Sequence, residues 1–364
     1  MLTADYEAET EKKPLPSPPL IREGSKSEEA ASCSSPDKGR LGGVSSPLAT
    51  IYKNLRQHWQ AMTLEMQRLE VENNRIFIEA YGLQDELTPD VPLNEITLTC
   101  NPHYRYGGNK TEAELETQLK ADTMAEFLSY AVGCMFGRYS IDQSGLILAN
   151  QGDTLQHYLA KIPQPRFTPD ADNVIPLIDF DGDWFEDDIA ERFKHFLKIT
   201  LGAENYQANL KFIEDALGKD VRKYFLKDFY ADHVKRYKKR PIYWLFSSPK
   251  GTFNALIYLH RYQPDTASIV LNDYLREFRT KLTARKQALE QVGIRSDTKE
   301  NQGEKTKALK ATAKIDQALA EINDYERDTL YPLATRQIAL DLDDGVKVNY
   351  PKLGKALKSV AGLS

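Results

Sequence analysis

The chain has 364 residues, of which 41% are hydrophobic and 28% are charged, so it can bury a core and is not a wholly disordered protein. Its 48 basic and 53 acidic residues give a formal net charge of -5, which excludes attraction of the whole protein to nucleic acid and leaves only a local patch for that role. The three cysteines, Cys33, Cys100 and Cys134, are far apart, and no apolar run reaches the roughly 20 residues of a membrane helix, so we expect a cytoplasmic protein with no disulfide framework and no membrane contact.

Residues 1–47 differ in composition from the rest of the chain. They are rich in proline, serine, glycine and charge, as in Pro14-Leu-Pro-Ser-Pro-Pro-Leu20. Such a segment buries too little apolar surface to offset the entropy lost on ordering, so we expect a disordered leader. A proline-rich peptide ligand is the alternative interpretation.

Residues 48–265 are expected to form a mixed α+β region in which helices and short strands are joined by loops. Apolar residues recur at helical spacing from Ile51 to Tyr81, and Thr111-Glu-Ala-Glu114 is a capping box that opens a second helix. Residues 184–240 predict several short amphipathic helices. Short apolar runs predict strands at Ile96–Cys100, Leu146–Ala149 and Val174–Ile178.

The clearest β element lies at residues 241–260, where two aromatic-rich runs flank the turn Ser248-Pro-Lys-Gly251 and predict a β-hairpin. Residues 266–335 carry two apolar stripes separated by a polar break, which predicts a long antiparallel helical hairpin. Residues 336–364 are expected to be a C-terminal tail. The predicted fold class is therefore α+β and predominantly helical.

One short motif, Asn101-Pro-His-Tyr104, is similar to the Asn-Pro-Pro-aromatic motif with which amino-group DNA methyltransferases hold a flipped base. His103 replaces the second proline, and no glycine-rich turn precedes the motif. We therefore favour a structural role, in which a proline ends a strand and begins a loop.

No other motif predicts an enzyme or a metal site. The acidic run Asp179–Asp188 has its glycine at the wrong position for a calcium loop, so it is expected to start a helix. The six histidines show no zinc-ligand spacing, and the chain has no GxSxG, Walker or GxGxxG motif. We assign no catalytic, cofactor-binding or metal-ligating residue.

The strongest signal is electrostatic and lies between Lys219 and Arg240, where nine basic residues stand against three aspartates. Four tyrosines are interleaved with them and would add hydroxyl donors and stacking faces: Tyr224, Tyr230, Tyr237 and Tyr243. Such a patch attracts DNA phosphates through counterion release. The residues predicted to contact DNA are Lys223, Lys227, Lys235, Arg236, Tyr237, Lys238, Lys239 and Arg240. A solvated basic helix face that pairs with Asp179–Asp188 is an equal alternative.

A second basic stretch runs from Arg276 to Lys310 within the predicted helical hairpin. We expect these basic residues to lie on the solvent-exposed face of the helical hairpin. Contact with the DNA backbone, or docking onto another domain, is the alternative.

Five long strings resemble the C-terminal part of the PglX family, the adenine-specific DNA methyltransferases of bacterial BREX phage-defence systems. The strings are Glu72–Leu83, Phe136–Ile141, Arg240–Gly251, Tyr258–Tyr262 and Asp341–Tyr350. The resemblance covers roughly residues 47–364. It implies a system that methylates adenine N6 at a non-palindromic site, with the target-recognition region lying in residues 48–265.

The family also has an N-terminal region that binds S-adenosylmethionine and carries an intact Asn-Pro-Pro-Tyr motif, for which this chain shows no counterpart. We therefore expect a separated or truncated C-terminal piece that binds double-stranded DNA and acts with an upstream methyltransferase chain or domain and with other BREX proteins. Methyl transfer by this chain alone is not expected. The alternative function is a non-catalytic structural or protein-interaction module of the defence complex.

Overall fold

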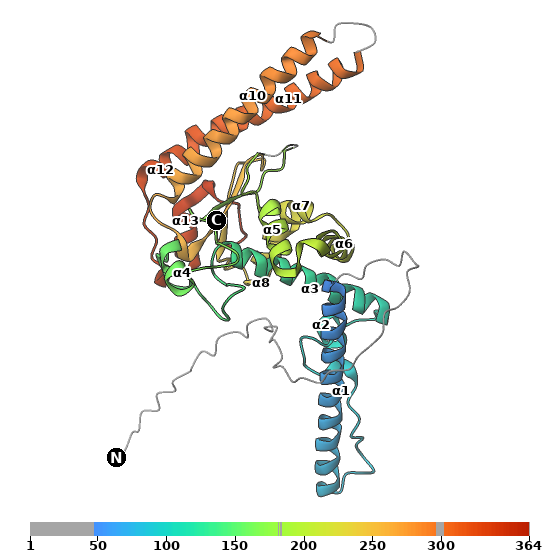
Figure 1. Cartoon of the computed structure of the whole chain (residues 1–364). Helices are drawn as coiled ribbons and strands as arrows, with labels where there is room; N and C mark the ends of the chain where they lie inside the picture. The colour runs from blue at the N-terminus through green and yellow to red at the C-terminus, as the bar shows by residue number, and fades with distance from the viewer. Residues whose placement is uncertain (1–46, 181, 183, 296–301, 364) are drawn as a thin grey trace, which may run out of the picture.

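The computed structural model describes residues 47–180, 182, 184–295 and 302–363 (Figure 1). The predicted leader therefore lies outside the described residues, except for Pro47. The fold is predominantly helical with one small antiparallel sheet, which confirms the predicted α+β class. In the described part of the chain, no helix has the length and apolar character needed to cross a membrane.

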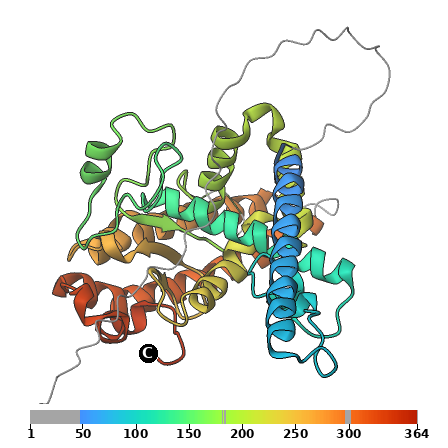
Figure 2. The same cartoon turned by 90° about the horizontal axis from the view of Figure 1, so that it is seen from below.

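The first half of the described chain is mostly helical. Its helices are α1 (Pro47–Tyr81), α2 (Pro102–Tyr106), α3 (Glu112–Met135), α4 (Leu155–Lys161), α5 (Ile189–Leu201) and α6 (Tyr206–Leu217). The capping box at Thr111 and Glu114 is present at the start of α3, as predicted. The amino-terminal end of α1 packs on α6, where the Leu48 amide donates to Asn209 Oδ1 at 3.1 Å. The remainder of α1 extends along one side of the molecule, away from the sheet (Figures 1 and 2).

The second half contains the sheet and the helical hairpin. Its elements are α7 (Val221–Tyr224), α8 (Tyr230–Arg236), β2 (Tyr243–Ser247), β3 (Asn254–Tyr258), α9 (Thr266–Ile269), α10 (Arg276–Arg295), α11 (Gln302–Tyr325), α12 (Tyr331–Arg336) and α13 (Val346–Leu353). A π-helical turn, Phe225–Phe229, joins α7 to α8, and we call the continuous element helix 221–236. Helices α10 and α11 pack on each other and project from the body as a long arm (Figure 1). The predicted helical hairpin is thus present.

The sheet has the order β1-β3-β2, with β1 formed by Val174–Pro176. Both pairings are antiparallel, and β2 and β3 form the predicted β-hairpin, with Tyr243 opposite Tyr258. Alternate residues of β3 enter two different hydrophobic cores. Ala255 and Ile257 face the core shared with α10, α11 and the C-terminal segment, whereas Leu256 and Tyr258 face the core shared with α3, α5 and helix 221–236.

Two predicted strands are wrong. Residues 96–100 form a loop that ends in a turn, because the buried side-chain amide of Asn101 donates to the carbonyls of Leu93 and Ile96 at 2.7 and 2.9 Å. Residues 146–149 form bends because the amides of Ile147 and Leu148 bond to the turn that follows α3 rather than to the sheet. In both segments, hydrogen bonds to a side chain or to a neighbouring turn take the place of a strand partner.

The C-terminal residues, which were predicted to be a tail, pack against the sheet. The Lys358 amide donates to the Leu245 carbonyl at 2.7 Å, and Leu357 forms an isolated β-bridge with Phe246. These contacts cover the free edge of β2, the outer strand. Ordered structure therefore continues beyond Tyr350 to residue 363, and Tyr350, Leu353 and Val360 are buried in the core.

Candidate nucleic-acid interface

Helix 221–236 separates an apolar face from a basic face. Asp220 caps its start by accepting a hydrogen bond from the Lys223 amide at 2.7 Å. A buried row at intervals of four residues packs into the core: Val221, Phe225, Phe229 and His233. Most of the lysine and arginine side chains of this helix are therefore directed to solvent.

His233 connects this helix to the sheet. Its ring is buried, and Nε2 accepts hydrogen bonds from the amides of Ile242 and Tyr243, each at 3.1 Å. Burial, with smaller contributions from Arg236 and Arg138, lowers the pKa of His233 to about 3. The imidazole therefore stays neutral at physiological pH and fixes the helix end against the first residues of β2.

Lys238 and Lys239 follow the helix in an uncommon backbone conformation. Both have positive φ angles, 49° and 62°, in the left-handed region that residues other than glycine rarely adopt. The Lys239 amide donates to the Val234 carbonyl at 2.8 Å, which ends the helix. Both side chains are exposed, and neither lies within ion-pair distance of a carboxylate in the described part of the chain. The turn thus presents two adjacent lysines that are unpaired among the described residues.

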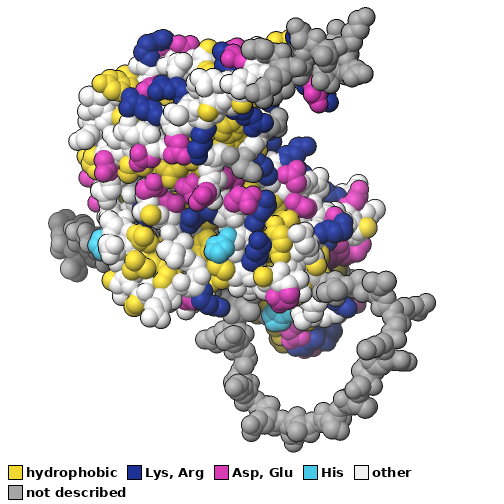
Figure 3. Space-filling model, turned by 45° about the horizontal axis from the view of Figure 1, so that its top comes forward, with side chains coloured by type: hydrophobic (Ala, Val, Ile, Leu, Met, Phe, Trp, Pro, Cys, Tyr) yellow, Lys and Arg dark blue, Asp and Glu magenta, His cyan; other side chains and the backbone are white. Residues whose placement is uncertain are grey.

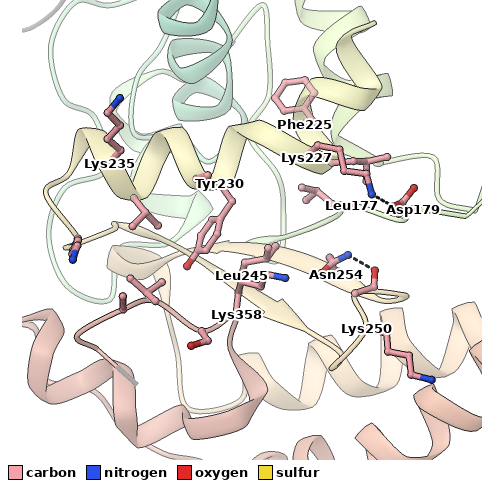
Figure 4. A pocket seen from close by; sticks show the side chains of 18 of the residues that line it. Leu177, Asp179, Phe225, Lys227, Tyr230, Lys235, Leu245, Lys250, Asn254 and Lys358 are labelled. Carbon is pink, nitrogen blue, oxygen red and sulfur yellow. Dashed lines mark hydrogen bonds and ion pairs between the residues drawn. The ribbon is translucent and has the colours of Figure 1, made fainter. Parts of the chain in front are cut away.

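A concave surface lies between helix 221–236 and the sheet (Figure 4). We call it the cationic groove, and its volume is about 860 Å³. Among the residues that the structure describes, its lining includes a single acidic residue, Asp179, which is paired with Lys227. Six lysines line it: Lys227, Lys235, Lys238, Lys239, Lys250 and Lys358. Such a concentration of one charge focuses the local potential and attracts polyanions.

Four of the eight residues predicted to contact DNA line the groove: Lys227, Lys235, Lys238 and Lys239. The other four, Lys223, Arg236, Tyr237 and Arg240, do not line it. Sequence reasoning missed Lys250, at the tip of the β-hairpin, and Lys358, in the C-terminal segment. No local pattern signals either of them, because the fold alone brings them beside helix 221–236.

Intramolecular pairing accounts for another part of the basic patch. Lys227 pairs with Asp179, and Arg222 pairs with Asp188 at 3.0 Å, as the alternative interpretation predicted. Lys219 pairs with Asp228 at 2.7 Å, and Arg236 lies 3.4 Å from Glu126. Acidic side chains also form a band across the face shown in Figure 3, with lysine and arginine on either side. The groove is therefore a local exception in a surface of mixed charge.

The predicted stacking role of the tyrosines is wrong for Tyr224 and Tyr243, because both are buried. Tyr224 donates to Asp232 at 2.9 Å. The Tyr237 ring is half-buried and packs on His233 with ring centroids 4.6 Å apart. Of the four tyrosines, only Tyr230 lines the groove.

The turn that carries Lys250 is held by a buried carboxylate from the helical hairpin. Glu321 of α11 accepts hydrogen bonds from Ser248 Oγ and from the Lys250 amide, each at 2.6 Å. It also accepts one from Thr252 Oγ1. These contacts tie one wall of the groove to the end of α11 that joins the body of the protein.

The other motifs have structural roles. Asn101 caps α2 by accepting from the His103 amide at 3.1 Å, so its side chain is occupied within the fold. Asp188 caps α5, as expected for an acidic helix start. In the second basic stretch, Arg276 and Arg279 both pair with Glu326. This pairing supports the interpretation that the stretch forms the solvent-exposed face of the helical hairpin. The described residues contain no group of three or more His, Cys, Asp or Glu side chains arranged to hold a metal ion.

Two curated proteins match most of this chain. An adenine-specific methyltransferase, BrxX of Escherichia coli O9:H4 (strain HS), is 36% identical over 316 residues, which are 82% of this chain and 25% of the relative. An adenine-specific methyltransferase, PglX of Lacticaseibacillus casei (strain Zhang), is 39% identical over 294 residues, which are 78% of this chain and 22% of the relative. No protein-family model matches the chain.

The chain therefore spans about a quarter of the length of the relatives it matches. The matches cover about four fifths of the chain. The resemblance predicted from the sequence is confirmed: this protein is a homologue of the adenine-specific methyltransferases BrxX and PglX.

Proposed function

We propose that this chain is the DNA-recognition part of a BREX-type system for site-specific methylation of adenine N6. The observation that carries the proposal is the cationic groove, in which the described lining places six lysines from three separate segments beside one paired aspartate. Each lysine that neutralises a phosphate releases a counterion, which makes binding to duplex DNA favourable and dependent on salt. The homology to adenine-specific methyltransferases supports DNA as the polyanion.

Within this proposal, methyl transfer belongs to another part of the methylation system, carried by an upstream domain or chain. S-adenosylmethionine is a sulfonium cation, and the lysines of the cationic groove would repel it. The described sheet is antiparallel and has no glycine-rich turn from a parallel strand into a helix, which is the usual cradle for a nucleotide cofactor. The described residues thus do not fit this cofactor, and we assign them no catalytic step.

The test is a titration of the purified chain with labelled duplex DNA at several salt concentrations. The variant Lys238→Glu with Lys239→Glu should weaken binding to all sequences alike and should lower the slope of log K against log salt by about two units, one for each lost phosphate contact. Uniform weakening is expected because phosphate contacts carry no base information.

The matched control is Lys307→Glu with Lys310→Glu, which makes the same change of charge at exposed positions on α11. This control should bind as the wild type does. Absence of binding at low salt, or binding that does not respond to salt, would contradict the proposal. Equal weakening by the control pair would assign the contact to the arm instead of the groove.

A protein-interaction module remains the second candidate because α1 exposes large apolar side chains. Phe77 and Tyr81 are 54% and 73% exposed and stack on each other with ring centroids 6.5 Å apart. Under this candidate, Phe77→Ser with Tyr81→Ser should reduce co-purification with the methyltransferase chain or other BREX proteins. Affinity for DNA should not change.

A further inference from the structure

The cationic groove has a second chemical character below its lysines. Apolar side chains form its floor and walls: Leu177, Leu226, Tyr230, Ala231, Val234, Leu245, Val360 and Ala361. Ala231 and Ala361 are exposed, and Leu226, Tyr230 and Val234 are half-buried, so part of this floor is in contact with water. In Figure 4, Tyr230 and Leu245 lie in the interior of the groove, between the helix and the strands.

Contact with an intact duplex uses only the rim of such a groove. Phosphates lie on the outside of the double helix, where lysine ammonium groups reach them without any hollow beneath. A phosphodiester chain is charged and hydrated, so it gains little from an apolar floor. The floor is therefore complementary to an additional, uncharged and apolar part of the ligand.

We propose that the cationic groove binds a single nucleotide whose base is not stacked in a duplex, with the base on the apolar floor and the flanking phosphates on the lysines. The volume of about 860 Å³ lies within the range of about 300–1,000 Å³ that is typical of small-molecule pockets. Contacts between bases and apolar or aromatic protein surfaces tolerate any base, because every base has a flat face. This inference rests on the proposed function in DNA recognition.

The arrangement of the lysines suits a nucleotide with phosphates on two sides. Lys238 and Lys239 lie in the turn that follows helix 221–236, whereas Lys250 and Lys358 come from the β-hairpin and the C-terminal segment. Helix and sheet thus each contribute cations that have no ion-pair partner in the part of the chain that the structure describes. A bound strand would pass between these two sets, with one phosphate near each.

The groove is held open by contacts between its walls. Tyr230 Oη on the helix lies 3.1 Å from Tyr350 Oη on α13, and the Tyr350 hydroxyl also donates to the Lys358 carbonyl. The backbone hydrogen bond from Lys358 to Leu245 fixes the C-terminal segment to the sheet. Because these contacts join all three segments that form the groove, little ordering entropy is lost when a ligand enters.

The experiment compares three probes at one salt concentration: a fully paired duplex, the same duplex with one extrahelical nucleotide, and free deoxyadenosine monophosphate as a competitor. The wild-type chain should bind the extrahelical probe at least about fivefold more tightly than the paired duplex, given the usual contribution of one stacked base. The free nucleotide should compete at high concentration.

The variant that distinguishes nucleotide binding from duplex binding is Ala231→Trp, which places an indole in the groove and leaves every lysine in place. It should abolish the preference for the extrahelical probe and keep the salt-dependent binding of the paired duplex. Val234→Phe fills the same floor from the next helical turn and serves if the first variant does not fold. Val348→Trp, at a 52% exposed position of α13 that does not line the groove, is the matched control.

Equal affinity for the paired and extrahelical probes, together with no competition by the free nucleotide, would overturn the nucleotide pocket while duplex binding persists. Competition by the free nucleotide without a preference for the extrahelical probe would support the pocket and assign it to a free nucleotide. Failure of the proposed function gives a different result, which is the absence of salt-dependent binding to the paired duplex.

Discussion

Glu321 provides the sharpest test of how the helical hairpin supports the groove. Glu321 as a whole is only 7% exposed, and its carboxylate accepts three hydrogen bonds from residues 248–252 of the β-hairpin. A hydrogen bond to a charged group contributes about 1.5–3 kcal/mol. Three such bonds set an upper limit of roughly 4–9 kcal/mol, and the net loss is smaller because the partly exposed donors at Lys250 and Thr252 regain water.

We therefore expect Glu321→Ala to lower the free energy of unfolding by about 3 kcal/mol, since Ser248 Oγ is buried and loses its acceptor. Glu321→Gln keeps one carbonyl oxygen in place, so its cost should be about 1–2 kcal/mol. Urea denaturation monitored by circular dichroism gives both values. The matched control is Glu277→Gln, which removes the same charge from an exposed i,i+4 pair with Lys281 and should cost less than about 0.5 kcal/mol.

The two Glu321 variants should also differ from wild type in DNA binding, because the turn presents Lys250 to the groove. In a double-mutant cycle, Glu321→Gln should add little to Lys250→Ala. Equal destabilisation by Glu321→Gln and Glu277→Gln would refute the reasoning, since it would mean that the buried carboxylate contributes no more than a surface one.

Two further predictions concern stability. Because the pKa of His233 is lowered to about 3 in the fold from an ordinary value of 6.5, the unfolded chain binds more protons between these pH values, and the free energy of unfolding should fall as pH drops from 6.5 toward 3. The slope from this residue should reach about 1.4 kcal/mol per pH unit and should disappear in His233→Gln, as measured by urea denaturation across this range. Gly137→Ala should cost more than about 2 kcal/mol, because φ is 76° and the new methyl group would lie 2.9 Å from Leu148 Cδ1. Gly82→Ala, with a φ of 67° and no heavy atom within 4 Å of the new methyl group, should cost only about 1 kcal/mol, and similar melting curves for the two variants would contradict the packing argument.

Local patterns predicted the local structure well. Helix α1, the capping box of α3 and the β2–β3 hairpin all depend on residues close together in sequence, and their periodicity or turn chemistry indicated each one. Residues 96–100 had the composition of a strand but no partner strand, so hydrogen bonds from Asn101 decided their conformation instead.

The site was predicted in part. A sequence shows where basic residues are concentrated, but it does not show which residues from distant segments meet in the fold. The four-residue spacing of Val221, Phe225, Phe229 and His233 marks the buried face of helix 221–236. This spacing could have shown that Tyr224, three residues after Val221, packs inward. No such signal exists for Lys250 and Lys358, which reach the groove through long-range packing. The carboxylate of Glu321, more than 60 residues from the turn it holds, is hidden from local patterns in the same way.

The position of the sheet between two cores has a consequence for how the molecule unfolds. Because each face of β3 completes a different core, loss of the strand would expose apolar surface on both sides at once. The arm and the helical body therefore cannot melt as independent units, and the described fold should show one cooperative transition rather than two. A chain cut near residue 265 would leave Trp244 and Ile257 without their covering helices, and we expect it to aggregate rather than to persist as a smaller folded protein.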